Sequence, residues 1–122
     1  MAHILVIDDE PGVRSMIRDT LEPEHTIAEA ADGIEGMQKF ATETFDLVIV
    51  DIIMPEQEGL ETLLQIHRLR ADQKIIAISG GGRTGTIEFL RLAENIGVTK
   101  TLKKPFSPAV LRDAVRFCLR SD

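Results

Sequence analysis

Residues 46–51 read DLVIVD, a run of branched aliphatic residues between two aspartates, and residues 3–7 read HILVI just before Asp8. Val and Ile favour strands, and a nearly continuous apolar run is typical of a strand covered on both faces of its sheet. Together with weaker runs elsewhere, these stretches predict five strands. The predicted strands are residues 3–7, 25–29, 46–50, 74–78 and 98–102.

Stretches of helical periodicity separate the predicted strands. Apolar residues recur there at spacings of three and four, which is the spacing of one face of an α-helix. The apolar stripes are Val13, Met16, Ile17 and Leu21; Ile34, Met37 and Ala41; Leu60, Leu63 and Leu64; Phe89, Ala93 and Ile96; and Leu111, Ala114, Val115 and Cys118. Strict alternation of strands and helices predicts a parallel sheet with helices on both faces. We therefore expect an α/β fold with a doubly wound, five-stranded (βα)5 sheet.

Capping residues agree with these helix assignments. Asp32 precedes the second helical stretch and Glu35 follows three residues later, which is the spacing of a capping box. Ser107 and Pro108 are typical of an N-cap followed by the first helical residue. Gly97 follows the fourth helical stretch, where a left-handed residue ends many helices. Each signal predicts a helix boundary that the structure can test.

Length and composition narrow the class of protein. A chain of 122 residues has the size of one domain, so we expect a single domain over residues 1–122 with no output domain. The lone Cys118 cannot form an intramolecular disulfide. The net charge of −6 argues against binding to nucleic acid or anionic membrane, and no apolar run reaches the roughly 18–20 residues of a membrane span. We expect a soluble, cytoplasmic protein.

Polar residues gather where the predicted strands end. Asp8, Asp9 and Glu10 follow the first predicted strand, Asp51 the third, Ser79 and Gly80 the fourth, and Lys103 and Lys104 the fifth. Open parallel sheets bind ligands outside the carboxyl ends of their strands, so these groups should converge. Carboxylates about 4 Å apart repel by about 1 kcal/mol per pair even in water, and oxygen-only ligands favour Mg²⁺. A lysine and a hydroxyl beside such an ion predict phosphoryl transfer to a carboxylate.

Four motifs in order resemble one family, the receiver domains of bacterial two-component response regulators. The motifs are Ile4–Glu10 (ILVIDDE), Asp46–Asp51 (DLVIVD) continuing to Met54 and Pro55, Ile78–Gly80 (ISG), and Leu102–Phe106 (LKKPF). The resemblance covers essentially the whole chain and implies the flavodoxin-like receiver fold. It also implies a signalling domain, not an enzyme in its own right, that takes part in its own phosphorylation and dephosphorylation.

The resemblance assigns roles residue by residue. Asp51 corresponds to the phosphoacceptor. Asp9 corresponds to the direct Mg²⁺ ligand, Asp8 acts through water, and the backbone carbonyl of Ile53 completes the protein ligands. Ser79 corresponds to the hydroxyl that turns toward the phosphoryl group, with Gly80 beside it. Lys104 corresponds to the lysine that pairs with the phosphoryl oxygens. Lys103 is the alternative, because it is the neighbouring residue. Successive strand residues face opposite sides of the sheet, so only one of the two lysines can reach the site.

Two positions depart from the family pattern and bear on the switch. Thr101 stands where the family usually carries an aromatic residue that swings inward, so readout through an aromatic rotamer is not expected. Lys100 stands where receivers that dimerise through the fourth helix, fifth strand and fifth helix often carry an aspartate. We expect the change to start at Ser79, to reorder residues 80–85 and the start of the fourth helix, and to alter partner binding through the face formed by residues 79–106.

Three functions remain as alternatives. The first is a receiver phosphorylated by a sensor histidine kinase or a phosphotransfer protein, with output through a downstream protein partner. The second is a Mg²⁺-dependent phosphohydrolase with an aspartyl-phosphate intermediate, which would need an acid two residues after the nucleophile, where this chain has Ile53. The third is a binding module that works without phosphorylation, against which the intact set Asp9, Asp51, Ser79 and Lys104 argues.

Overall fold

The computed structural model describes residues 1–54, 58–80 and 86–120. Strands and helices alternate strictly in this part of the chain. In chain order they are β1 (His3–Ile7), α1 (Pro11–Leu21), β2 (Thr26–Ala30), α2 (Gly33–Thr42), β3 (Leu47–Asp51), α3 (Glu58–Leu69), β4 (Ile75–Gly80), α4 (Thr86–Ile96), β5 (Lys100–Lys104) and α5 (Pro108–Arg120). The expected alternation is confirmed.

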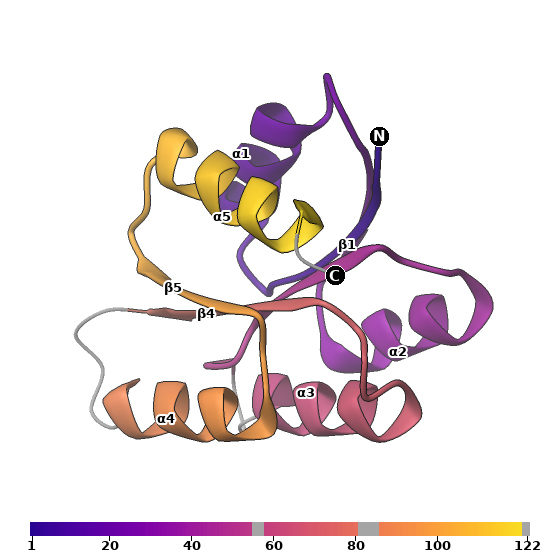
Figure 1. The fold of residues 1–122 in the computed structure, drawn as a ribbon, viewed down its shortest axis with the longest axis vertical. Helices are drawn as coiled ribbons and strands as arrows, with labels where there is room; N and C mark the ends of the chain where they lie inside the picture. The colour runs from indigo at the N-terminus through magenta and orange to yellow at the C-terminus, as the bar shows by residue number, and fades with distance from the viewer. Residues whose placement is uncertain (55–57, 81–85, 121–122) are drawn as a thin grey trace.

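The five strands form one parallel sheet in the order β2-β1-β3-β4-β5. Helices α1 and α5 lie on one face of the sheet, and α2, α3 and α4 lie on the other (Figure 1). The chain moves outward from β1 to β2 and then crosses to β3 on the other side of β1. This is the doubly wound arrangement, and the predicted fold class is confirmed.

The three central strands, β1, β3 and β4, each contribute four consecutive buried apolar residues to the core. Alternate residues of each strand face opposite sides, so β1 sends Ile4 and Val6 toward α1 and α5 and sends Leu5 and Ile7 toward α2, α3 and α4. These four side chains are fully buried. Burial on both faces explains why the strands read as continuous apolar runs.

The predicted helix boundaries agree with the structure. The Asp32 side chain accepts a hydrogen bond from the Glu35 amide at 2.8 Å, and the Ser107 hydroxyl accepts one from the Val110 amide at 3.1 Å. Gly97 has a φ of +103°, in the left-handed region where glycine carries no steric penalty. Cys118 is fully buried on α5.

The expected end of β1 is confirmed, and the other four expected strand ends were one or two residues too early. β3 ends on Asp51, β4 continues through Ser79 to Gly80, and β5 ends on Lys104 instead of before Lys103. The parallel ladder continues through these polar residues, since Ser79 pairs with Lys103 and Gly80 with Lys104. Apolar periodicity underestimates strands whose last residues belong to a polar site.

The expected buried stripe of α2 was also wrong in part. Ile34 is 71% exposed, whereas Gly33, Gly36 and Phe40 are buried. A Cβ at Gly36 would lie 2.5 Å from Cδ1 of Ile7, so the helix approaches β1 closely through its glycine face. A helix face made of glycines packs its backbone directly against the sheet. Such a face carries no large apolar side chains, so the apolar pattern of the sequence does not reveal it.

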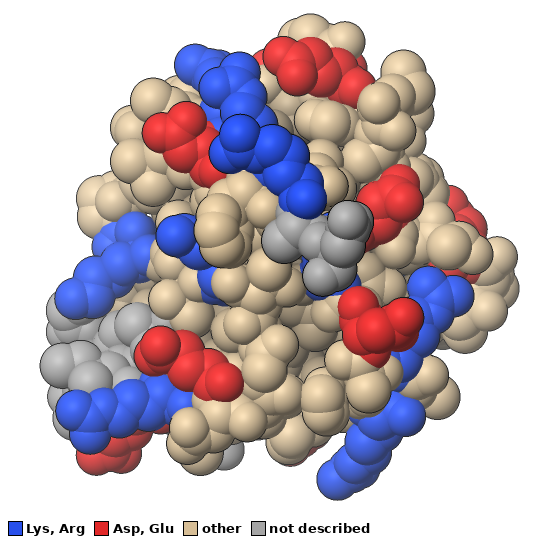
Figure 2. All heavy atoms as spheres, in the orientation of Figure 1, with Lys and Arg blue, Asp and Glu red and all other residues tan. Residues whose placement is uncertain are grey.

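The surface has mixed charge. Basic and acidic side chains are interspersed over the face that carries α5 (Figure 2). Among the helices of the described residues, none has the length and apolar character needed to cross a membrane. The expected reordering of residues 80–85 falls mainly on residues 81–85, which lie outside the described part of the chain.

Candidate functional site

The predicted polar groups meet at the carboxyl ends of β1 and β3. These neighbouring strands lie where the winding of the chain reverses, because β1 is followed in space by β2 on one side and by β3 on the other. In an open α/β sheet such a switch point creates a crevice that binds ligands. The fold therefore places Asp8 and Asp51 side by side at the position where this topology forms a site.

Asp51 is the last residue of β3 and is almost completely buried, with 2% of its surface exposed. Its two carboxylate oxygens have different partners. Oδ1 accepts a hydrogen bond from the Ile53 amide at 2.9 Å, and Oδ2 accepts one from Lys104 Nζ at 2.9 Å. The carboxylate is thus held in one orientation at the end of the central strand.

Lys104 joins three carboxylates. Its Nζ lies 3.0 Å from Asp8 Oδ2, 2.8 Å from Glu10 Oε1 and 2.9 Å from Asp51 Oδ2. Lys104 ends β5, and its ammonium crosses β4 to reach the ends of β1 and β3. Lys103, its neighbour on the strand, is exposed. The alternation of strand side chains therefore brings Lys104 to the cluster and turns Lys103 away from it.

Burial changes the proton affinities of this cluster. Burial raises the pKa of Asp51 to about 6, and the hydrogen bond from Lys104 offsets only part of that effect. Burial likewise raises the pKa of Asp8, although the Glu10 amide and Lys104 stabilise its charged form. Burial alone would lower the pKa of Lys104, but its hydrogen bonds to Glu10 and Asp51 outweigh this and raise the pKa. The site has more negative charge than one lysine neutralises.

This excess charge predicts a pH dependence of stability in the absence of divalent ions. A carboxyl whose pKa is raised in the folded state stabilises the fold when it is protonated. For Asp51 this contribution is complete at pH values below the ordinary pKa of 3.8, and it disappears as the pH rises through about 6. Lowering the pH from 7.5 to 5 in chelator should therefore raise the free energy of unfolding by about 1 kcal/mol through Asp51. Urea denaturation of the protein and of Asp51→Asn at both pH values measures the effect. An equal pH response in both would contradict this electrostatic description.

The oxygens at this edge fit a divalent cation. Asp8, Asp9, Glu10 and Asp51 each offer a carboxylate oxygen, and these oxygens all lie within 4.8 Å of one another. Carboxylates without His or Cys are the donor set of a hard ion such as Mg²⁺. Asp8 and Asp51 are buried, while Asp9 and Glu10 are exposed. An ion held here would be anchored by buried carboxylates and open to solvent on one side.

Ser79 offers a further polar group. It lies in β4 next to Ile78, the register partner of Asp51, and is fully buried. Within the described part of the chain, its Oγ has no hydrogen-bond partner. A buried hydroxyl without a partner costs about 1–3 kcal/mol, so this atom is suited to a ligand that arrives at the site.

The other predicted site residues lie near the carboxylate cluster or on the neighbouring strands. Gly80 ends β4 beside Lys104 in the register, and Asp9 is exposed after β1. Ile53 contributes its amide to Asp51, while the predicted contribution of its carbonyl to a metal stays a prediction. Thr101 is half-buried in β5, one register pair before Leu102.

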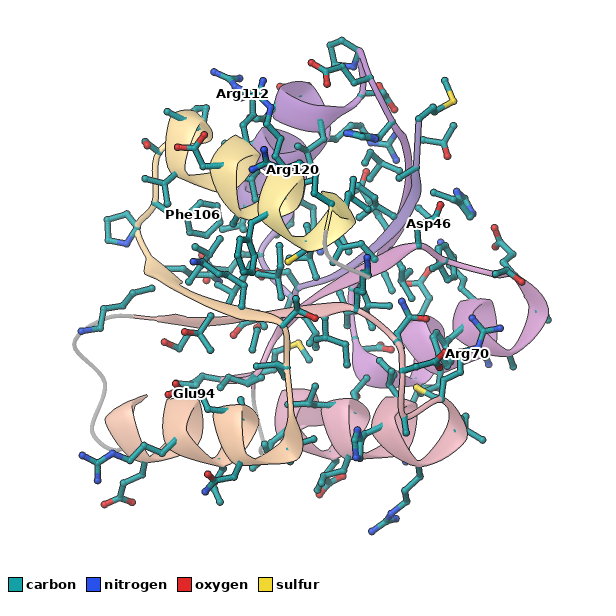
Figure 3. All side chains as sticks on the ribbon, in the orientation of Figure 1. Asp46, Arg70, Glu94, Phe106, Arg112 and Arg120 are labelled. Carbon is teal, nitrogen blue, oxygen red and sulfur yellow. The ribbon has the colours of Figure 1, made fainter. Side chains whose placement is uncertain are left out.

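A mainly apolar cavity of about 410 Å³ adjoins the cluster. Its lining residues come from Glu10 and α1, from the last residues of β4 and β5, and from the chain just after β5. They are Glu10, Val13, Met16, Gly80, Lys104, Pro105 and Phe106. Phe106 lies beside α5 (Figure 3) and packs against the core. The carboxylates can therefore be approached from a surface that is apolar around a charged centre.

Sequence reasoning missed two contacts of this site. Glu10 holds Lys104, although only its position after β1 hinted at a role. Arg14 donates from Nη1 to the backbone carbonyl of Asp8 at 2.5 Å. Neither contact has a signature in local spacing, because Glu10 meets a residue 94 positions away and the Arg14 side chain folds back from α1 onto the end of β1.

The fold and the site together define a class of protein: doubly wound α/β proteins with a buried aspartate at the end of the central strand, opposed by a lysine from the fifth strand. The chain belongs to the response regulator receiver domain family, whose family model matches residues 4–116. It is a CheY-like receiver domain of two-component response regulators, and the suspected resemblance is confirmed.

Individual relatives agree over nearly the whole chain. The chain is 33% identical over 118 residues to the chemotaxis protein CheY of Bacillus subtilis, covering 94% of this chain and 96% of the relative. It is similar to the receiver domain of NtrX from Brucella abortus, with a TM-score of 0.89, 26% identity and coverage of 98% and 99%. It is also similar to TrrA from Thermotoga maritima in complex with Mg²⁺-BeF, with a TM-score of 0.80, 32% identity and coverage of 95% and 97%.

Proposed function

We propose that Asp51 accepts a phosphoryl group from a sensor histidine kinase or a phosphotransfer protein, and that the phosphorylated chain binds a downstream protein differently. The observation that carries this proposal is the contact of the Lys104 ammonium with Asp51, Asp8 and Glu10 at the switch point of a receiver sheet. A buried carboxylate at this position can act as a nucleophile, and the lysine can pair with the oxygens that arrive.

The proposed reaction exchanges one bond for another. An oxygen of Asp51 attacks the phosphorus of a phosphohistidine, the P–O bond of an acyl phosphate forms, and the P–N bond breaks with its electron pair left on the ring nitrogen, which takes a proton from solvent to leave as imidazole. The Ile53 amide fixes Oδ1, and Lys104 contacts Oδ2 and neutralises negative charge near the transferring group. Ser79 supplies the buried hydroxyl that can donate to a phosphoryl oxygen.

Mg²⁺ fits this site as the cofactor. Asp9 and Asp51 would hold it directly, Asp8 would act through water, and the Ile53 carbonyl would complete the protein ligands. When bound, Mg²⁺ supplies positive charge opposite the transferring phosphoryl group. The structure of the relative TrrA is of a complex with Mg²⁺-BeF, which supports this assignment.

In this proposal the phosphorylated chain binds its downstream partner through the face formed by residues 79–106. Ser79 and Lys104 connect the site to β4 and β5, which carry this face. Lys100 lies on β5 with its Nζ 4.8 Å from the centre of the Phe117 ring on α5, so a cation covers this aromatic residue. The partner contacts would include Lys100, without an aromatic at Thr101.

The alternative phosphohydrolase lacks its acid. The residue two positions after Asp51 is Ile53, whose amide is already bound to Asp51 and whose side chain is half-buried and apolar. A general acid needs a titratable group within reach of the leaving oxygen. The chemistry available to these residues therefore supports transfer to Asp51 over turnover of a separate substrate.

Intact mass spectrometry tests the proposed function. The protein is incubated with a small-molecule phosphodonor, with Mg²⁺ or with chelator. We expect one added phosphoryl group with Mg²⁺ and none with chelator. An unmodified mass under both conditions contradicts the phosphoacceptor role and favours the phosphorylation-independent binding module.

Mg²⁺ should stabilise the folded protein. It would bind the folded site, where four carboxylate oxygens converge, and not the unfolded chain. By mass action, a free ion at 100 times its Kd adds about 2.7 kcal/mol to the free energy of unfolding. Thermal melting with increasing Mg²⁺ measures the effect, with Asp51→Asn expected to show a smaller rise. Identical melting in millimolar Mg²⁺ and in chelator contradicts the metal site.

Lys104 and Lys103 form a matched pair of variants. Lys104→Ala removes the ammonium that contacts Asp51, whereas Lys103→Ala removes an exposed side chain from the same strand. We expect Lys104→Ala to slow phosphorylation at least about tenfold, the effect of losing one charge-assisted hydrogen bond of 1.4 kcal/mol, and Lys103→Ala to change the rate less than twofold. Time courses of the mass change compare them. Equal defects contradict the assignment to Lys104.

A further inference from the structure

Asp8 is held by its backbone as well as by its side chain. Its amide donates to the carbonyl of Ala30 at 3.1 Å, which fixes it to β2. Its carbonyl accepts from Nη1 of Arg14 at 2.5 Å, which fixes it to α1. Its Oδ1 accepts from the Glu10 amide at 2.9 Å, so the turn after β1 closes on the carboxylate itself. Both peptide groups that flank the Asp8 side chain therefore have a partner from another element.

Arg14 is held in turn by Glu29. Nε of Arg14 lies 3.1 Å from Glu29 Oε1, and the Arg14 side chain is only 16% exposed. Glu29 belongs to β2, directly before Ala30, whose carbonyl receives the Asp8 amide. The guanidinium thus bridges β2 and the turn after β1 through two different nitrogens. A planar guanidinium can make both bonds in a fixed geometry, which an ammonium cannot do.

Glu29 also contacts a second arginine. Arg18, one helical turn after Arg14, donates from Nε to Glu29 Oε2 at 2.5 Å and from Nη2 to the Ile27 carbonyl at 3.3 Å. Burial alone would raise the pKa of Glu29, but the hydrogen bonds from Arg18 and Arg14 outweigh it and lower the pKa. The carboxylate is therefore charged at neutral pH and anchors both arginines. Of these two arginines, only Arg14 contacts Asp8 in the described part of the chain.

We infer that Arg14 is a positioning residue for the cation site, and that it sets the direction of the Asp8 carboxylate by holding the Asp8 carbonyl against Glu29. This inference rests on the proposed binding of Mg²⁺. Asp8 is fully buried beside Asp51, and the repulsion between the two carboxylates, which Lys104 offsets in part, opposes the close approach that a cation needs. The bridge through Arg14 opposes that displacement before any ion arrives. Partners that orient a metal ligand are commonly worth a factor of 10–100 in metal affinity.

The matched variants are Arg14→Gln and Arg18→Gln. Each removes one cation from α1 and one ion pair with Glu29, and glutamine keeps a similar helix propensity. Only the first removes the hydrogen bond to the Asp8 carbonyl. Arg14→Lys keeps the positive charge but cannot bond Glu29 and the Asp8 carbonyl through two separate nitrogens in a fixed plane. It is the variant with the smallest expected loss of stability.

Mg²⁺ affinity and metal-free hydrogen exchange together test the inference. By isothermal calorimetry, we expect the Mg²⁺ Kd to rise about tenfold in Arg14→Gln and in Arg14→Lys, and less than twofold in Arg18→Gln. In chelator, exchange of the amides at residues 8–10 should accelerate in Arg14→Gln and not in Arg18→Gln, even where urea denaturation finds equal losses of stability.

The outcomes separate this inference from the proposed function. If the unmodified protein binds no Mg²⁺, the proposed cofactor and the role of Arg14 are both wrong. If the unmodified protein binds Mg²⁺ and Arg14→Gln binds it equally well, the site stands and the positioning role is overturned. Equal weakening in Arg14→Gln and Arg18→Gln also overturns it, because the effect would then come from charge or stability and not from the Asp8 carbonyl.

Discussion

Asp51→Asn is expected to abolish phosphorylation by a small phosphodonor and Mg²⁺. An amide is not a nucleophile toward phosphorus, so the loss should exceed a hundredfold. The replacement keeps the shape of the side chain, and its oxygen can still accept a hydrogen bond from the Ile53 amide. Because the Asp51 pKa is raised to about 6, removing this charge should not destabilise the metal-free fold at neutral pH.

Asp113→Asn provides the matched control for this variant. Asp113 lies on α5, its side chain is 80% exposed, and its contact with Arg116 is 3.9 Å long. The same chemical change at this position should leave phosphorylation unchanged. Intact mass after equal incubation compares the two variants, and circular dichroism checks their fold. Modification of Asp51→Asn at the rate of the unmodified protein would exclude Asp51 as the acceptor.

The central strands were predictable because their physics is local. β1 and β3 are covered on both faces, so burial selects a continuous apolar run that can be found in the sequence. β5 lies at the sheet edge, and only Leu102 among its five residues is buried. Its boundary was missed by two residues because the backbone ladder to β4, and not apolar side chains, defines that strand.

The site was predictable to the extent that it follows topology. Asp51 and Lys104 end their strands and Asp8 directly follows β1, and the carboxyl ends of strands in a parallel sheet meet at one edge. The contacts of Glu10 and Arg14 were not predictable in this way. Glu10 meets Lys104 from the other end of the chain, and Arg14 reaches the Asp8 carbonyl while paired with Glu29 on β2, so both contacts depend on tertiary packing.

The stability of this site is balanced between opposing groups. Burial of Asp8 and Asp51 side by side is unfavourable, as their raised pKa values indicate. Lys104 offsets part of this cost through its three contacts, and the Arg14 bridge holds the backbone. A cation bound at this edge, or a change of charge at Asp51, would therefore alter the electrostatic balance at the carboxyl ends of β1, β3 and β5.

The second large effect is expected at Gly59, where Gly59→Ala should lower the free energy of unfolding by at least about 3 kcal/mol. A Cβ at Gly59 would lie 2.7 Å from Cα of Ile52 and 2.8 Å from the carbonyl carbon of Asp51, and closer still to the Asp51 carbonyl oxygen. All three are backbone atoms, which cannot move aside as a flexible side chain can. Overpacking of a rigid site typically costs 1–3 kcal/mol, and a backbone overlap this close belongs at the upper end or beyond.

Gly12→Ala is the matched control, because Gly12 and Gly59 are the second residues of α1 and α3. A Cβ at Gly12 has no atom within 4 Å, so alanine there should only restrict the unfolded chain and add up to about 1 kcal/mol of stability. Urea denaturation measures both variants. Gly59→Ala should also slow phosphorylation, because the overlap falls on the backbone of Asp51 and either this backbone or the start of α3 must shift. If Gly59→Ala retains stability within 1 kcal/mol of the unmodified protein, α3 does not pack on the end of β3 as closely as described.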